Sequence, residues 1–187
     1  MPTPTRFQDA LAYAAALHAG QRRKLSGEPY VAHLLAVAAI VMEHGGDEDE
    51  AIAALLHDAV EDQGGLATRE EIGRRFGQRV VEIVDGCTDA VETPKPPWRP
   101  RKEAFIGRLH GASTSVRLVV AADKLHNAQS ILRGYRRLGQ SLWGQFRGGR
   151  EGSLWYFRAV ADALKRAELT PLVEELEEAV GQMEKLA

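Results

Sequence analysis

The sequence has little of what secreted, membrane-spanning or nucleic-acid-binding proteins need. It contains one cysteine, Cys87, so it cannot form an internal disulfide. Lys and Arg total 24 against 26 Asp and Glu, which leaves no excess positive charge for sequence-independent binding to nucleic acid. Apolar runs stay below the roughly 18 to 20 residues that cross a bilayer; the longest are Val31–Met42, which His33 interrupts, and Leu118–Ala122.

A secretory signal is also missing, because Met1–Thr5 has no apolar segment. We therefore expect a cytoplasmic protein that binds a small molecule, with neither nucleic acid nor membrane as a partner. The composition leaves the oligomeric state open.

Strand patterns are absent too, since no alternating Val, Ile and Thr runs are bounded by Asn-Gly or Asp-Gly turns. Apolar residues recur instead at helical spacing, and 187 residues with 44% hydrophobic content suffice for one buried core. The sequence thus predicts an all-α fold in a single domain over residues 1–187. Helices are expected near residues 5–19, 29–44, 48–60, 68–76, 78–87, 101–110, 114–134, 150–168 and 171–185.

Polar caps set several of these boundaries. Thr5–Gln8, Asp47–Glu50 and Thr68–Glu71 each pair an N-cap acceptor with Glu or Gln three residues later. His44-Gly45-Gly46 is typical of a helix end, and Thr170-Pro171 of a helix start.

Two segments are predicted to be flexible connections, and the first of them cannot be helical. Thr93–Pro100 is rich in proline and is expected to be a non-helical surface loop that carries cations. Gly144–Arg150 is rich in glycine, and its two arginines either reach a ligand or belong to a solvated connection.

The candidate metal-binding residues are His and Asp side chains that interrupt or end apolar helical runs. His57-Asp58 ends the run Ala51–Leu56, His33 interrupts Val31–Met42, and Asp123 follows Val116–Ala122. Burying these groups is costly unless they are paired or bind a metal, and His with Asp is a mixed nitrogen and oxygen donor set for a divalent cation. A core histidine with satisfied hydrogen bonds is the alternative for any one of them.

Further polar groups follow at helical spacing. Glu61 and Asp62 lie one helical turn after His57-Asp58. A metal ion lowers the pKa of a bound water, and a carboxylate at this position can orient that water or accept its proton. Alternatively, the two carboxylates only solvate the end of the helix. Asn127 lies four residues after Asp123 and offers an amide for a ribose or base. His126 is expected to pack or face solvent.

A basic turn precedes the His33 helix. Three consecutive cations, Arg22, Arg23 and Lys24, are either a solvated surface or a binding site for phosphate oxygens. Together with the metal ligands and carboxylates they indicate hydrolysis of a phosphate ester.

These residues resemble the hydrolase domain of the RelA/SpoT alarmone enzymes, in particular the stand-alone small hydrolases of the metazoan SpoT homologue type. The resemblance rests on three motifs in the family's order, over about two-thirds of the chain: His18-x-Gly20-Gln21-x-Arg23-Lys24-x-x-Gly27-x-Pro29-Tyr30-x-x-His33, Leu55-Leu56-His57-Asp58-x-x-Glu61-Asp62, and Ala122-Asp123-Lys124-Leu125-His126-Asn127.

The resemblance implies an HD-type helical bundle with one Mn²⁺ between helices and removal of the 3′-pyrophosphate from guanosine tetra- or pentaphosphate. It implies metal binding by His33, His57, Asp58 and Asp123, and water activation by Glu61 and Asp62. It implies substrate contacts for Arg23, Lys24, Lys102, Asn127 and Tyr156; Tyr156 is alternatively a core aromatic. No synthetase or regulatory segment is expected, so the protein should only degrade alarmones.

Three alternatives stay open at this point. One is another HD-family nucleotidase or phosphatase, which the metal ligands alone permit. Another is a non-catalytic alarmone sensor, which the two carboxylates Glu61 and Asp62 disfavour. The third is a different base, because the chain departs from the family around 94–100 and 144–150, so an adenosine alarmone or another pyrophosphorylated nucleotide is an alternative substrate.

Overall fold

The structure is a computed structural model, and it describes residues 6–90 and 94–186. Within these ranges the chain forms ten α-helices, one 3₁₀ helix and no strand, apart from an isolated bridge between Arg22 and Pro29. The all-α prediction is therefore confirmed. In chain order the elements are α1 Arg6–Leu17, α2 Val31–Glu43, α3 Glu48–Leu56, α4 Ala59–Asp62, α5 Gly65–Phe76, α6 Gln78–Cys87, α7 Trp98–Leu109, α8 Thr114–Leu138, the 3₁₀ helix η1 Gly139–Gln145, α9 Gly149–Ala167 and α10 Pro171–Lys185.

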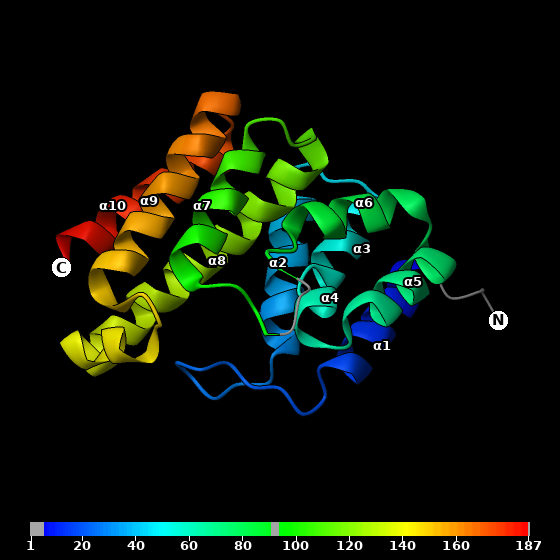
Figure 1. The fold of residues 1–187 in the computed structure, drawn as a ribbon, viewed down its shortest axis with the longest axis horizontal. Helices are drawn as coiled ribbons and strands as arrows, with labels where there is room; N and C mark the ends of the chain where they lie inside the picture. Colours follow the sequence, from blue (N-terminus) through cyan, green and yellow to red (C-terminus); the bar gives the residue numbers. More distant parts are fainter. Residues whose placement is uncertain (1–5, 91–93, 187) are drawn as a thin grey trace.

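The long helix α8 organises the bundle. It packs against α10 and α9 on one side and against α2, α3 and α6 on the other. Figure 1 shows the result: α9 and α10 lie at one end of the molecule, α1 and α5 at the opposite end, and α8 runs between them. In the described part of the chain, no helix is long and apolar enough to span a membrane.

Helix α3 is the most deeply buried element. All six residues from Ala51 to Leu56 are buried, so α3 contacts other parts of the protein on every side. Leu34, Val37 and Val41 of α2 are also fully buried, and α2 packs directly on α3. Because His57 follows α3 immediately, this burial carries its side chain into the interior.

Most of the predicted caps are present. Asp47 accepts a hydrogen bond from the Glu50 amide at 3.0 Å, and the Glu50 carboxylate accepts one from the Asp47 amide at 2.8 Å. The Thr170 hydroxyl accepts from the Val173 amide at 3.3 Å, with Pro171 as the first residue of α10. Gly45 ends α2 with a φ of 80°, which favours glycine. Thr5 lies outside the described residues.

The cap predicted at Thr68 was wrong. Helix α5 starts at Gly65, because the chain turns at Gly64 with a φ of 120° and enters the helix three residues early. The Thr68 hydroxyl lies inside the helix and donates instead to the Gln63 carbonyl at 2.6 Å.

The prediction that the segment up to Pro100 is non-helical was also partly wrong. Helix α7 begins at Trp98 and includes Pro100, since an amide in the first turn of a helix has no partner to lose. The Trp98 indole packs edge-on against Trp155 and Tyr156 of α9. Residues 94–97 are outside helices as expected, and Thr93 lies outside the described residues.

Three other expected boundaries moved. The helix expected over 48–60 is divided into α3 and α4, with His57 and Asp58 at the junction. The helix expected to end at 134 continues to Leu138, where Gly139 with a φ of 55° terminates it. The segment 144–150, expected to be flexible, includes the end of η1, a turn over residues 146–148 and the start of α9.

Core packing between α8 and α10 should be a large contributor to stability. Leu176→Ala removes a fully buried side chain from α10, and we expect it to lower the free energy of unfolding by about 2–5 kcal/mol. Urea denaturation followed by circular dichroism measures this. Leu169→Ala is the matched control, because Leu169 is 52% exposed. Equal losses in both variants would contradict the assigned packing.

Candidate metal and phosphate site

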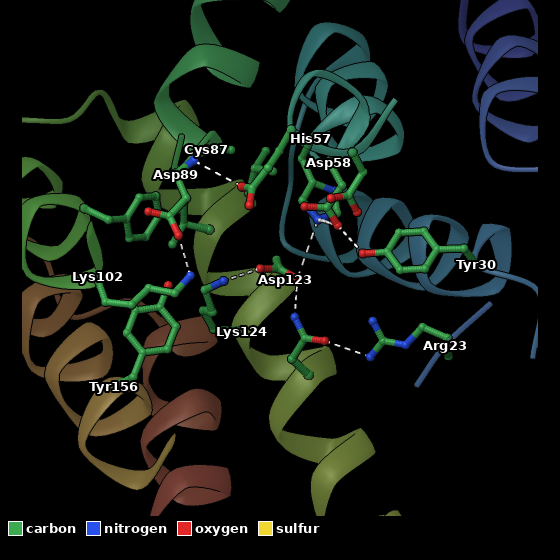
Figure 2. A pocket seen from close by; sticks show the side chains of 16 residues that line it. Arg23, Tyr30, His57, Asp58, Cys87, Asp89, Lys102, Asp123, Lys124 and Tyr156 are labelled. Atoms are coloured by element: carbon green, nitrogen blue, oxygen red, sulfur yellow. Dashed lines mark hydrogen bonds and ion pairs between the residues drawn. The ribbon is translucent and has the colours of Figure 1, made fainter. Parts of the chain in front are cut away.

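Four predicted metal ligands converge from three parts of the chain. The ligand atoms of His33, His57 and Asp58 all lie within 4.8 Å of one another. Asp123 of α8 joins them, with its Oδ1 3.2 Å from the Nε2 of His33 and 3.5 Å from the Nε2 of His57. Figure 2 shows Asp123 reaching from α8 toward His57 and Asp58. The packing of α2, α3 and α8 on one another thus brings the predicted set together.

Both imidazoles are oriented for coordination through Nε2. The Nδ1 of His57 lies 2.8 Å from the Ala54 carbonyl, to which it donates its proton. The Nδ1 of His33 lies 2.7 Å from the Nδ1 of His126. Both Nε2 atoms are buried without a hydrogen-bond partner and face the carboxylates of Asp58 and Asp123. Two nitrogens and two carboxylates in this arrangement fit a divalent metal ion.

The electrostatics of this cluster favour anionic carboxylates. Burial opposes ionisation of Asp58, but the charge of His57 outweighs it and lowers the pKa of the carboxyl. Burial likewise opposes ionisation of Asp123, whose pKa Lys124 and the two histidines hold well below its usual value. Burial lowers the pKa of His33, whereas at His57 the neighbouring carboxylates outweigh burial and raise the pKa. Because a histidine binds a metal ion in its neutral form, metal binding at this site competes with protonation of His57.

A line of hydrogen bonds connects the basic turn to the cluster. Asn127 donates to Oδ1 of Asp123 at 2.5 Å and accepts from Arg23 at 2.8 Å. The Tyr30 hydroxyl donates to Asp58 at 2.5 Å, and Lys124 donates to Oδ2 of Asp123 at 2.6 Å. The orientation of both carboxylates is therefore fixed by partners that also border the cavity.

Glu61 and Asp62 line the same inner cavity as Asp58, as their spacing predicts. Glu61 accepts hydrogen bonds from Lys95 at 2.8 Å and from the Asp89 amide at 3.3 Å. Asp62 accepts from Gln21 at 2.9 Å. Burial, followed by the charge of Asp58, raises the pKa of Asp62. The two carboxylates thus border the space beside the cluster without belonging to it.

Two cavities form the site. The inner one, of about 210 Å³, is lined by His57, Asp58 and Asp123 of the cluster and by the carboxylates of Glu61 and Asp62. The outer one, of about 450 Å³, shares several of these residues and is bordered by side chains of positive charge. The cations that line it are Arg22, Arg23, Lys24, Lys95, Arg101, Lys102, Lys124 and Arg147. A site with local positive charge on a chain of net charge −2 suits a small phosphorylated ligand.

Lys102 and Tyr156 both lie in the site. Lys102 donates to Asp89 at 2.5 Å, and its Nζ lies 4.6 Å from the centre of the Tyr156 ring. Tyr156 is buried, so it is a core aromatic, and it also lines both cavities. The two interpretations of this residue are compatible.

Sequence reasoning missed several residues at this site. His126 packs as expected, but its partner is the proposed metal ligand His33; its position three residues after Asp123 was the available signal. The cations of the proline-rich loop were expected at the surface, but nothing in the sequence placed Lys95, Asp89 or Arg101 at this site. Asp89 accepts hydrogen bonds from both Arg101 and Lys102.

A model of the HD domain family matches residues 10–154 of the chain, which include every residue of the four-ligand cluster and both carboxylates. The chain belongs to the HD-domain family. It is 34% identical over 178 residues to the guanosine-3′,5′-bis(diphosphate) 3′-pyrophosphohydrolase MESH1 of Mus musculus, covering 94% of this chain and 90% of the mouse protein. The similarity places it with the small RelA/SpoT-type members of the family.

A solved structure agrees with this placement. A metazoan ortholog of SpoT, described as hydrolyzing ppGpp, superposes with a TM-score of 0.80 and 30% sequence identity, covering 97% of this chain and 98% of that one. A GTP pyrophosphokinase of Myxococcus xanthus is 36% identical over 131 residues, and the chain spans 17% of its length. The similarity to that long enzyme therefore concerns one domain of it.

Proposed function

We propose that this protein is a Mn²⁺-dependent hydrolase that removes the 3′-pyrophosphate from guanosine 3′,5′-bis(diphosphate) and related alarmones. The observation that carries the proposal is the position of the four-ligand cluster at the base of a cleft bordered by cations and by two further carboxylates. The names of the MESH1 relative and of the solved metazoan structure support this substrate. We further propose that residues 1–187 act as one cytoplasmic HD-type domain.

Each group has a distinct role in this proposal. His33, His57, Asp58 and Asp123 would hold the ion, which supplies Lewis-acid stabilisation of a phosphate oxygen and lowers the pKa of water. Glu61 and Asp62 orient the attacking water and accept its proton. Substrate contacts fall to side chains that line the cleft, namely Arg23, Lys24, Lys102, Asn127 and Tyr156.

The bond changes follow from this placement. Water attacks the inner phosphorus of the 3′-diphosphate and a new P–O bond forms. The bond between that phosphorus and O3′ of the ribose breaks, and O3′ takes up a proton. Pyrophosphate leaves with its P–O–P bridge intact, so the other product from guanosine tetraphosphate is GDP.

The products of a single turnover test this function. Guanosine tetraphosphate incubated with excess enzyme and Mn²⁺ should give GDP and pyrophosphate in equal amounts, separated by anion exchange. The adenosine counterpart, run in parallel, tests selectivity for the base. Orthophosphate as the first product would contradict the proposal and indicate an ordinary HD-type phosphatase; absence of any product would indicate a binding protein.

A further inference from the structure

Lys95 contacts both of the carboxylates to which the proposed mechanism gives proton transfer. Its Nζ lies 2.8 Å from Oε1 of Glu61 and 3.8 Å from Oδ1 of Asp62. Figure 2 shows the cavity that these carboxylates border. A carboxylate oxygen that accepts a hydrogen bond from an ammonium group is less free to accept one from water. Lys95 thus occupies one of the two Glu61 oxygens that could bind the attacking water.

Lys95 is also placed to meet a phosphate group. It lines the outer cavity together with Arg23, Lys24 and Lys102. Its side chain is 33% exposed, and its four-carbon stem lets the ammonium group move without a backbone change. A diphosphate carries more negative charge than one carboxylate and competes well for this cation.

The backbone on both sides of Lys95 is held in place by prolines and by the packing of Trp98. Pro94, Pro96 and Pro97 restrict φ on both sides of it. Immediately after them, Trp98 packs against α9 and lies so close to Gly148 that a Cβ there would be 2.7 Å from the ring. This anchoring fixes where the Lys95 side chain starts, so that its reach includes both Glu61 and the outer cavity.

We propose that Lys95 is a phosphate-binding residue that exchanges Glu61 for the substrate, so that entry of the diphosphate releases the Glu61 carboxylate to bind water. The inference rests on the proposed function for its substrate, but the exchange itself concerns any diphosphate in the cleft. Inorganic pyrophosphate, in the presence of Mn²⁺, is therefore a suitable probe that requires no turnover.

The binding test compares four proteins by calorimetry with pyrophosphate. Lys95→Ala should weaken binding about tenfold, the order expected for a lost charge-assisted hydrogen bond, and Lys95→Arg should restore most of it. Lys165→Ala is the matched control, because Lys165 forms a similar lysine–glutamate pair with Glu177 on the far helices α9 and α10. Unchanged binding in Lys95→Ala, or no binding by the wild type, would overturn the proposal.

A double-mutant cycle tests the exchange directly. In the wild type, Lys95 must leave Glu61 before it binds pyrophosphate, whereas in Glu61→Gln this close ion pair is gone and only the longer contact with Asp62 remains. Lys95→Ala should therefore cost more binding in the Glu61→Gln background than in the wild type. Equal costs in both backgrounds would overturn the exchange. Kinetics with guanosine tetraphosphate provide a separate readout, in which Lys95→Ala should raise KM more than it lowers kcat. If the wild type does not turn over this substrate, the proposed function is wrong. The binding experiments with pyrophosphate still decide the role of Lys95 in that case.

Discussion

Glu61→Gln is expected to lower kcat by about 10²- to 10⁴-fold, the range that general acid–base catalysis supplies, while the protein keeps its metal ion. The amide preserves the shape of the side chain and can still accept a hydrogen bond, but it cannot take up a proton at neutral pH. Glu61 lies outside the four-ligand cluster and is bonded to Lys95 and to the Asp89 amide, so its replacement removes no proposed metal ligand.

The measurement pairs steady-state kinetics with metal analysis of the same preparation. Glu82→Gln is the matched control, because Glu82 lies on the exposed face of α6 and should leave both quantities unchanged. If Glu61→Gln is found without Mn²⁺, Glu61 is a metal ligand and its assignment to proton transfer is wrong.

Loss of the metal ion is expected to abolish turnover and to lower the melting temperature. Without a metal ion, the carboxylates of Asp58 and Asp123 have only His57, His33 and Lys124 as nearby positive charges, and the free energy of metal binding no longer stabilises the folded state. Chelation of the wild type should produce both effects, and Mn²⁺ should reverse them. His57→Ala removes an Nε2 atom that has no other partner, so this variant should be inactive and low in metal.

The comparison that separates metal loss from general damage is the response to chelator. The melting temperature of His57→Ala should not change on chelation, whereas that of His110→Ala should fall as in the wild type, because His110 is exposed at the end of α7. Full activity in chelator, with metal analysis showing that the ion is gone, would disprove the metal-dependent mechanism.

Local patterns in the sequence were enough for the fold class and for most helix boundaries. Helices α6 and α10 have the predicted bounds, since a cap or a breaker residue acts within one turn of its own position. The Thr68 cap failed because Gly64 and Gly65 turn the chain upstream of it, and two start signals so close together compete. The first turn of α7 was missed because proline is tolerated there although it is excluded from helix interiors.

The candidate metal ligands could be chosen from the sequence because His33, His57, Asp58 and Asp123 each place a polar group in or beside an apolar run, where burial demands compensation. The sequence by itself determined that His33, His57 and Asp123 would be buried, with Asp58 beside them at the end of the buried run. Only the tertiary structure decided which atoms meet: His126 on His33, Arg23 on Asn127, Lys95 on Glu61, and Arg101 with Lys102 on Asp89. The first three of these contacts join residues at least 34 positions apart in the sequence. All four depend on how α2, α7 and α8 pack and on the path of residues 94–97. Local periodicity and capping carry no information about such distances, because they act over one or two helical turns, whereas side-chain pairing across the cleft is set by the packing of whole helices.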